Sequence, residues 1–121
     1  MTILSLGLNR MADLAGSTWA YFGIGTVSTN TTSGMTDLTS TITPRRVISA
    51  AVIINNVCSL VGFLQPSQNN SASSVVEIAF FDASTGGNML FRSIASTNAW
   101  TEFTKDATKS ALIVCDLTIS A

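Results

Sequence analysis

The sequence predicts a mainly β protein, an antiparallel β-sandwich of jelly-roll-like form with one short N-terminal α-helix. Stretches rich in Val, Ile and Phe alternate with stretches rich in Gly, Asn and Ser, as in short strands joined by turns. Only the start of the chain has a helical period, and no second helix is expected. With 121 residues we expect a single β-sandwich domain over 1–121, in which residues 1–16 form an N-terminal helix or arm.

The segment 3–15 has the spacing of an amphipathic helix. Its apolar residues recur every three or four positions and share one face; they are Leu4, Leu8, Met11 and Leu14. Gly16 follows at a position where glycine often ends a helix. A short helix attached to a sandwich has few places in its own chain to bury this face, so we expect it to contact another subunit.

A long polar loop separates the next two β segments. Aromatic and β-branched residues with glycines predict a kinked strand over 18–26. Residues 27–43 are dominated by Ser, Thr, Asn and Gly, and we expect an exposed loop with one short strand at 35–39. The stretch 45–57 lacks clean alternation, as in a strand that is buried on both faces or bent between two sheets. It continues as strand over 58–64 after a bulge at Asn55-Asn56.

Three further strands are expected in the second half. Residues 75–81 and 89–95 form a hairpin, because the Gly86-Gly87 pair between them supplies positive φ angles. The polar run 65–73 is a connecting loop. The last strand, 111–119, is half buried: its apolar residues alternate with a side that is largely polar.

Composition excludes several function classes. Charged residues make up 11% of the chain, against roughly 25% in an average soluble domain, and the formal net charge is -1. The polar surface must therefore come from the sixteen Ser and sixteen Thr, and such a neutral surface favours a subunit of an assembly over a free monomer. No nucleic-acid partner is expected, because no basic field attracts phosphates. No apolar run approaches the roughly 20 residues that span a bilayer, so no membrane contact is expected.

Reactive chemistry is not expected either. Histidine is absent, which removes the usual general base and the commonest zinc ligand, so we expect no enzyme, no cofactor, no metal and no small-molecule substrate. Cys58 and Cys115 lack metal-type spacing. Because the start of the chain has no cationic segment of a signal peptide, we expect two buried thiols. The alternative is a disulfide formed late, in a particle that leaves the cell.

Two groups of charged residues have structural interpretations. Glu77 lies within an apolar strand and needs a partner if it is buried, and Arg92 on the returning strand supplies one. We expect a cross-strand structural pair rather than a catalytic carboxylate. Glu102 and Asp106 lie beside Lys105 and Lys109, and solvated surface pairs are the expectation there.

The remaining candidates are residues of subunit contact. Arg45 and Arg46 either contact acidic residues of another subunit or mark an exposed strand start. Trp19, with Tyr21, Phe22 and Trp100, could form an aromatic platform for sugars, although core or subunit-contact roles are favoured. The predicted subunit-contact residues are Leu4, Leu8, Met11, Trp19, Arg45 and Arg46.

Several stretches resemble small structural proteins of tailed bacteriophages. Residues 7–14 (GLNRMADL) and 19–26 (WAYFGIGT) are similar to their opening helix and to a strand ending in Gly-Xaa-Gly-Thr. Residues 77–82 (EIAFFD) and 86–92 (GGNMLFR) are similar to their pattern of a Glu, an apolar strand, a glycine turn and a Leu-Xaa-Arg return. The Thr-containing end of the last strand, 117–120, is also shared. The motifs fall within about two thirds of the chain, in the same order.

This resemblance implies a virion component made in the bacterial host cytoplasm. The function it implies is a capsid cement (decoration) protein, a homotrimer on the capsid exterior that bridges and stabilises capsomers of the major capsid protein. The alternative is a module of a tail, neck or receptor-binding fibre. Two positions depart from the pattern, since Ala79 stands where a Gly is expected and Pro44 where an acidic residue is expected.

Overall fold

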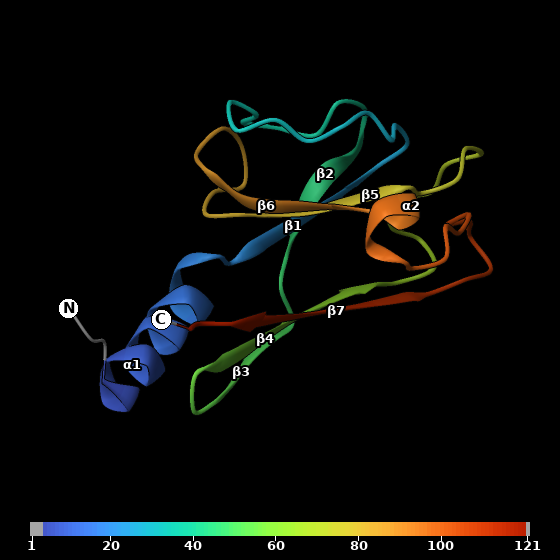
Figure 1. Cartoon of the computed structure of the whole chain (residues 1–121). Coiled ribbons are helices and arrows are strands. Elements are labelled where there is room, and N and C mark those ends of the chain that lie inside the picture. Colours follow the sequence, from blue (N-terminus) through green and yellow to red (C-terminus); the bar gives the residue numbers. More distant parts are fainter. Residues whose placement is uncertain (1–3, 121) are drawn as a thin grey trace.

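The computed structural model describes residues 4–120, and it is mainly β, as predicted, with two antiparallel sheets and an N-terminal helix (Figure 1). The first three residues of the predicted arm lie outside the described range. The larger sheet has the strand order β2-β1-β5-β6 and the smaller has the order β3-β4-β7. The elements are α1 (Ser5–Thr18), β1 (Tyr21–Gly25), β2 (Thr41–Val47), β3 (Ala50–Ile54), β4 (Val57–Leu64), β5 (Glu77–Phe81), β6 (Met89–Ile94), α2 (Ala95–Asn98) and β7 (Ala111–Thr118).

The predicted hairpin is present as β5 and β6, which are joined by a turn over 82–88. Gly86 and Gly87 have φ angles of +61° and +67°, which an L side chain rarely adopts. The expectation that strand begins at Val75 is wrong, because that residue instead forms an isolated bridge with Phe103. The one-turn helix α2 after β6 is a second correction, since four residues are too few to show a helical period.

The chain crosses from one sheet to the other between β2 and β3, which is one of the two forms that the pattern of 45–57 allows. The bulge predicted at Asn55-Asn56 is instead the tight turn of the β3–β4 hairpin, in which Ile54 pairs with Val57. Asn55 has a φ of +56°, a conformation that Asn tolerates better than most residues. Polar turn residues between two apolar runs therefore mark a reversal of the chain here.

The strand predicted at 35–39 is absent, and residues 26–40 form a continuous loop between β1 and β2. Leu38 is the buried side chain of this loop and packs against Ala79 and Phe81. One buried position does not provide the alternating apolar face that holds a strand on a sheet.

The core lies between the two sheets. The four-stranded sheet contributes Phe22, Ile24 and Phe80, and the three-stranded sheet contributes Leu60 and Leu64. These side chains are almost fully buried, and burial of each one stabilises the fold by about 1.5–3 kcal/mol. The ring of Phe80 stacks on that of Phe91 with centroids 5.4 Å apart, which joins β5 to β6.

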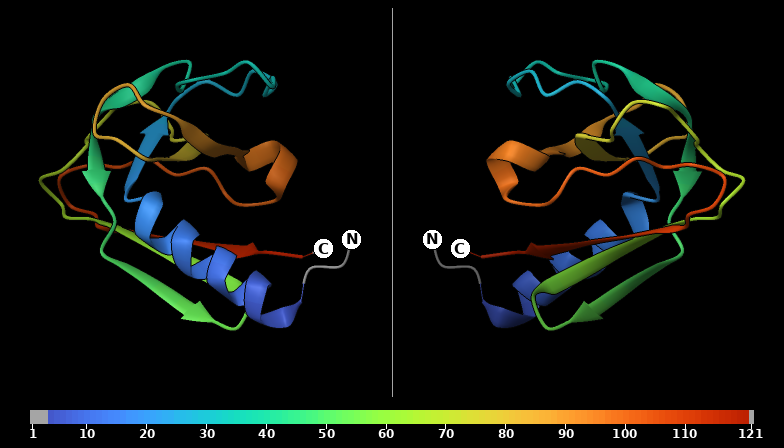
Figure 2. Two further views of the ribbon diagram at one scale, coloured as in Figure 1. Left: turned by 90° about the vertical axis from the view of Figure 1, so that its left-hand side faces the viewer. Right: turned by 90° about the vertical axis from the view of Figure 1, so that its right-hand side faces the viewer.

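Helix α1 packs on the three-stranded sheet (Figure 2). Its buried residues are Ala12 and Gly16, and Gly16 lies against Ile53 and Cys58 on the face of β3 and β4 that also carries the core. The helix thus covers part of the core-facing side of that sheet, and its smallest side chains make the contact. No helix among residues 4–120 is long and apolar enough to cross a bilayer.

Candidate interaction surfaces

Glu77 and Arg92 form the buried ion pair that the sequence predicts. Glu77 opens β5, and Arg92 lies on β6, diagonally across the ladder in which Glu77 faces Ile94. The Arg92 Nε donates to Glu77 Oε2 at 2.6 Å, and neither side chain is exposed. Burial removes both charged groups from water, which costs free energy. Their mutual attraction offsets this cost only when the ion-pair geometry is good and further hydrogen bonds satisfy the remaining polar atoms.

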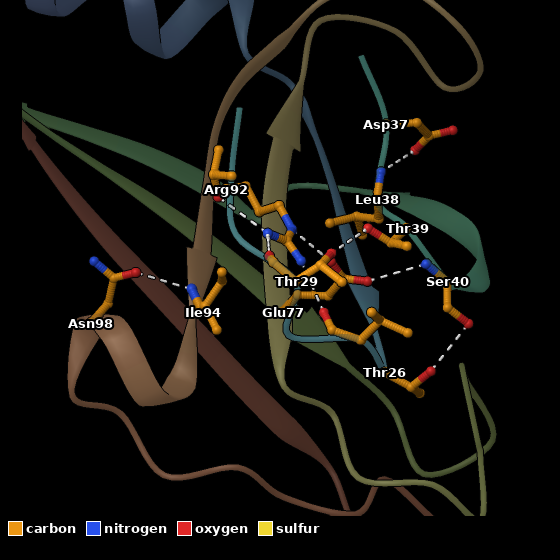
Figure 3. A network of polar contacts seen from close by, with 12 residues as sticks. Thr26, Thr29, Asp37, Leu38, Thr39, Ser40, Glu77, Arg92, Ile94 and Asn98 are labelled. Carbon is orange, nitrogen blue, oxygen red and sulfur yellow. Dashed lines mark hydrogen bonds and ion pairs between the residues drawn. The ribbon is translucent and has the colours of Figure 1, made fainter. Parts of the chain in front are cut away.

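The remaining polar atoms of the pair hold the loop 26–40, which we call the clamped loop (Figure 3). The Arg92 guanidinium donates to the carbonyl oxygens of Val27 and Thr29 and to Thr31 Oγ1. At the other end of the loop, the Ser40 N–H donates to Glu77 Oε1 at 3.3 Å. One buried pair therefore fixes both ends of a long polar loop against the edge of the core.

Gly25 is required by the same arrangement. A Cβ built on Gly25 would lie 2.2 Å from Glu77 Oε1 and 2.6 Å from the Ser40 carbonyl oxygen. The sequence explains the Gly23-Ile24-Gly25 stretch as a strand kink, and the pairing of β1 with β2 is indeed irregular between Phe22 and Ile24. The close approach of the Glu77 carboxylate could not be inferred from that stretch alone.

Arg45 has several partners within its own chain. Its guanidinium lies over the ring of Phe81, with Cζ 3.4 Å from the centroid, and Nη1 donates to the carbonyls of Ala83 and Gly86. An ion pair of 3.2 Å joins it to Asp37 in the clamped loop. The interpretation as an exposed strand start is wrong, because this side chain is almost buried, and the subunit contact predicted for it stays a prediction.

Arg46 also has an internal partner. Its Nε donates to Asn69 Oδ1 at 2.7 Å, and the Asn69 amide donates in turn to the carbonyls of Ile42 and Pro44. Asn69 is buried and has a φ of +52°. The second arginine of the doublet thus ties the loop after β4 to β2 through its Nε, and the subunit contact predicted for it stays a prediction.

Lys105 does not form the solvated surface pair that was expected of it. Its side chain is fully buried, and Nζ donates to the carbonyls of Pro66 and Asp106 and to Asn70 Oδ1. A pair of the predicted kind does form between Lys109 and Asp106, at 3.5 Å and in solvent. Lys105 is buried because three oxygens converge on it, and such convergence has no signature in the sequence.

The predicted contact residues of α1 divide between two environments. Leu8 is half buried, whereas Leu4, just before the helix, and Met11 are exposed, as is Leu14 on the same face. The helix packs on β3 and β4 through its small residues and not through this apolar face, so the subunit contact expected of the face stays a prediction. The exposed residues form a second, adjacent stripe, which we call the α1 stripe.

The aromatic platform considered for sugars is not assembled. Trp19 is half buried and packs against the core between the sheets, in which Phe22 is fully buried, and Trp100 packs there as well. Tyr21 packs instead beside Leu38 and Phe81. The four aromatic side chains therefore have packing roles in two separate clusters.

The three-stranded sheet carries a second exposed apolar surface on the side away from the core. Its large side chains are between 43% and 67% exposed, and we call this surface the outer face; it comprises Val52, Ile54, Phe63, Leu112 and Val114. Strands of eight residues make it about 26 Å long and three strands make it about 14 Å wide. The sequence analysis missed it, although Leu112 and Val114 interrupt the polar side of the last strand.

The described residues offer little reactive chemistry. Among residues 4–120, no three His, Cys, Asp or Glu side chains gather in a way that could hold a metal ion. Both cysteines are free thiols, Cys58 buried and Cys115 half buried. Burial raises the pKa of the Cys115 thiol to about 11, helped by the nearby Asp116 carboxylate, and burial also raises the pKa of Cys58. Both therefore remain protonated and unreactive near neutral pH.

Comparison with known proteins identifies no relative: no family model, no curated protein and no solved structure matches this chain.

Proposed function

We propose that this chain is a structural subunit of a tailed-bacteriophage virion, a capsid cement (decoration) protein that bridges and stabilises capsomers of the major capsid protein. The observation that carries the proposal is the outer face, whose large apolar side chains a free monomer leaves in water. A subunit that docks through this face removes these side chains from water, and every symmetry-related copy adds the same stabilising contact. The jelly-roll-like form of the sandwich is part of the same proposal.

The buried pair of Glu77 and Arg92 that holds the clamped loop, which we call the clamp, links this proposal to the sequence resemblance. Gly25, Glu77 and Arg92 belong to the stretches that resemble phage structural proteins, and they come together around one buried carboxylate. These three residues, which are distant in the chain, thus act together to hold the clamped loop. The stretches that carry the resemblance therefore indicate a rigid structural framework rather than a catalytic site.

The α1 stripe is the surface that we assign to a homotrimer. Met11 and Leu14 have the three-residue spacing of a helix-packing seam, and Leu4 lies seven residues before Met11, which is about two helical turns. Three copies that meet along this stripe bury it while the outer faces remain free for the capsid exterior. Synthesis in the host cytoplasm fits two free thiols, since disulfides form mainly in oxidising compartments.

The second candidate is a module of a tail, neck or receptor-binding fibre. The clamped loop favours it, because a stretch of exposed hydroxyl and amide side chains held at both ends is suited to polar recognition of a receptor. In this alternative, the clamped loop and not the outer face is the binding surface.

Binding to capsids that lack this protein separates the two candidates. Ile54→Lys places a charge on the outer face, and we expect at least tenfold weaker capsid binding, because an interface must then bury an unpaired ammonium. Ser84→Lys, on the exposed β5–β6 turn, is the matched control and should bind as the wild type does. Equal binding by both variants would contradict the assignment of the outer face.

Copy number in purified virions provides an independent measurement. A cement protein is present in a fixed, high ratio to the major capsid protein, because it occupies a repeated lattice position. A few copies per particle, removed together with the tail, would overturn the cement assignment and support the fibre module.

A further inference from the structure

We propose that β7 pairs antiparallel with β7 of a second copy of this chain across a two-fold axis, so that two three-stranded sheets become one six-stranded sheet. This contact goes beyond the proposed function and does not depend on it. It uses a surface other than the α1 stripe.

The free edge of β7 carries backbone groups that another strand could pair with. Ile119 donates its N–H to the Asn56 carbonyl, and β7 pairs with β4 without a register shift, so odd-numbered residues of β7 direct their backbone groups to β4. The N–H and C=O groups of Leu112, Val114 and Asp116 therefore point away from the sheet. Within residues 4–120, no strand pairs with this edge, which Figure 2 shows at the border of the sheet opposite β3.

The edge lacks most of the features that usually prevent pairing with another chain, although Asp116 places one charge on it. Proteins protect exposed edges with proline, lysine, bulges or short strands. All eight residues of β7 are described; they include no Pro and no Lys, and the ladder is regular. The residues beside the open edge on the outer face are Leu112 and Val114, which are apolar and more than half exposed.

Self-complementarity of the exposed residues favours a second copy of this chain in one register. If Ile113 of each copy lies opposite Ile113 of the other, Leu112 faces Val114 in both directions, and their edge-facing groups exchange hydrogen bonds. Ser110 of one copy then faces Asp116 of the other, and Lys109, whose own ion pair with Asp106 is exposed to solvent, lies at the same end. The two-fold axis repeats this Lys–Asp match. A register centred on Asp116 would instead oppose two carboxylates.

The wall of the sandwich beside β7 is open and apolar. A groove of about 360 Å³ lies there between the two sheets, and its lining includes Phe91, Trp100, Phe103 and Cys115. A second β7 in the plane of the sheet lies along the mouth of this groove and carries its own Ile113 on the groove side. Pairing therefore covers apolar lining as well as free backbone groups.

A two-fold contact through β7 is compatible with the trimer proposed above. A chain that makes both contacts links trimers to one another, which is how isologous and cyclic interfaces combine in closed assemblies. The two outer faces also become continuous, so the apolar surface is about twice as wide.

Backbone hydrogen exchange in the full-length protein tests the contact directly. We expect exchange at Leu112 and Val114 to be at least tenfold slower in concentrated than in dilute protein, because their N–H groups become bonded only on association. Ala51 and Ile53, whose N–H groups face the opposite edge of the same sheet, are the internal controls and should not change. If Leu112 and Val114 exchange at the same rate at every concentration, the pairing does not exist.

Three variants address the same contact in sedimentation experiments. Val114→Pro removes an edge-facing N–H, which an edge strand tolerates, and it should abolish the β7 contact. Lys109→Glu should weaken association about tenfold and change stability little, because the Lys109–Asp106 pair that it also removes is exposed. Adding Asp116→Lys should restore association. Wild-type association in Lys109→Glu, or no recovery in the double variant, would overturn the register, and undiminished association in a folded Val114→Pro would overturn the pairing.

Discussion

Replacement of Arg92 by methionine tests how the clamp holds the fold. The substitution keeps most of the side-chain volume but removes four donated hydrogen bonds, one to Glu77 and three to the clamped loop. It also leaves the Glu77 carboxylate buried without its cation. Breaking a buried pair in this way costs about 3–5 kcal/mol, a large part of the roughly 5–15 kcal/mol that stabilises a typical domain.

Urea unfolding monitored by circular dichroism measures this loss of unfolding free energy. Arg10→Met is the control, because the Arg10–Asp13 pair on α1 is exposed and its removal should change stability by less than about 1 kcal/mol. The double variant Glu77→Leu/Arg92→Met removes both charges, and we expect it to be more stable than Arg92→Met alone.

Hydrogen exchange supplies the structural readout. In Arg92→Met, amides of the clamped loop should exchange faster, while those of β4 and β7 should change only as far as global stability changes. A loss below about 1 kcal/mol in Arg92→Met would refute the reasoning that an uncompensated carboxylate dominates the effect.

Three further predictions concern other sites. Gly25→Ala should lower the unfolding free energy by about 1–3 kcal/mol through overpacking, whereas Gly34→Ala, with nothing within 4 Å of the added Cβ, should be nearly neutral by urea unfolding. Because burial raises the folded-state pKa of Cys115 from 9.0 to about 11, its stabilising contribution is complete below pH 9 and is lost as pH rises toward 11; a Cys115→Ala variant should show a flatter decline of stability over that range. Hydrogen bonds from the backbone N–H and from the side-chain amide of Asn88 lower the pKa of Asp82. Asn88→Ala removes the side-chain bond alone and should raise that pKa part of the way toward its ordinary value in an NMR titration.

Local patterns in the sequence predicted several elements with their causes. The helical period after Leu4 indicated α1, and the Gly86-Gly87 turn indicated the β5–β6 hairpin. The pairing of Glu77 with Arg92 followed from one carboxylate in an apolar strand and one cation on its neighbour. In each case the determining interaction lies within a few residues or across a single turn.

Other features depend on segments that meet only after folding. Arg45 is sandwiched between Phe81 and the turn after β5, and Lys105 is surrounded by oxygens from the loop after β4. Both looked like surface cations, because a charge is buried only when distant partners converge on it. The outer face was likewise hidden, since the side of a strand that meets solvent depends on which sheet covers the other side.

The sequence by itself determined the β class, the N-terminal helix, the hairpin and the absence of histidine chemistry, because composition and short-range periodicity depend only on neighbours along the chain. The tertiary structure alone decided that α1 packs through its small residues, that the polar loop is clamped at both ends, and that β7 lies at an open edge. These outcomes depend on long-range pairing, in which each side chain's exposure is set by elements far away in the sequence.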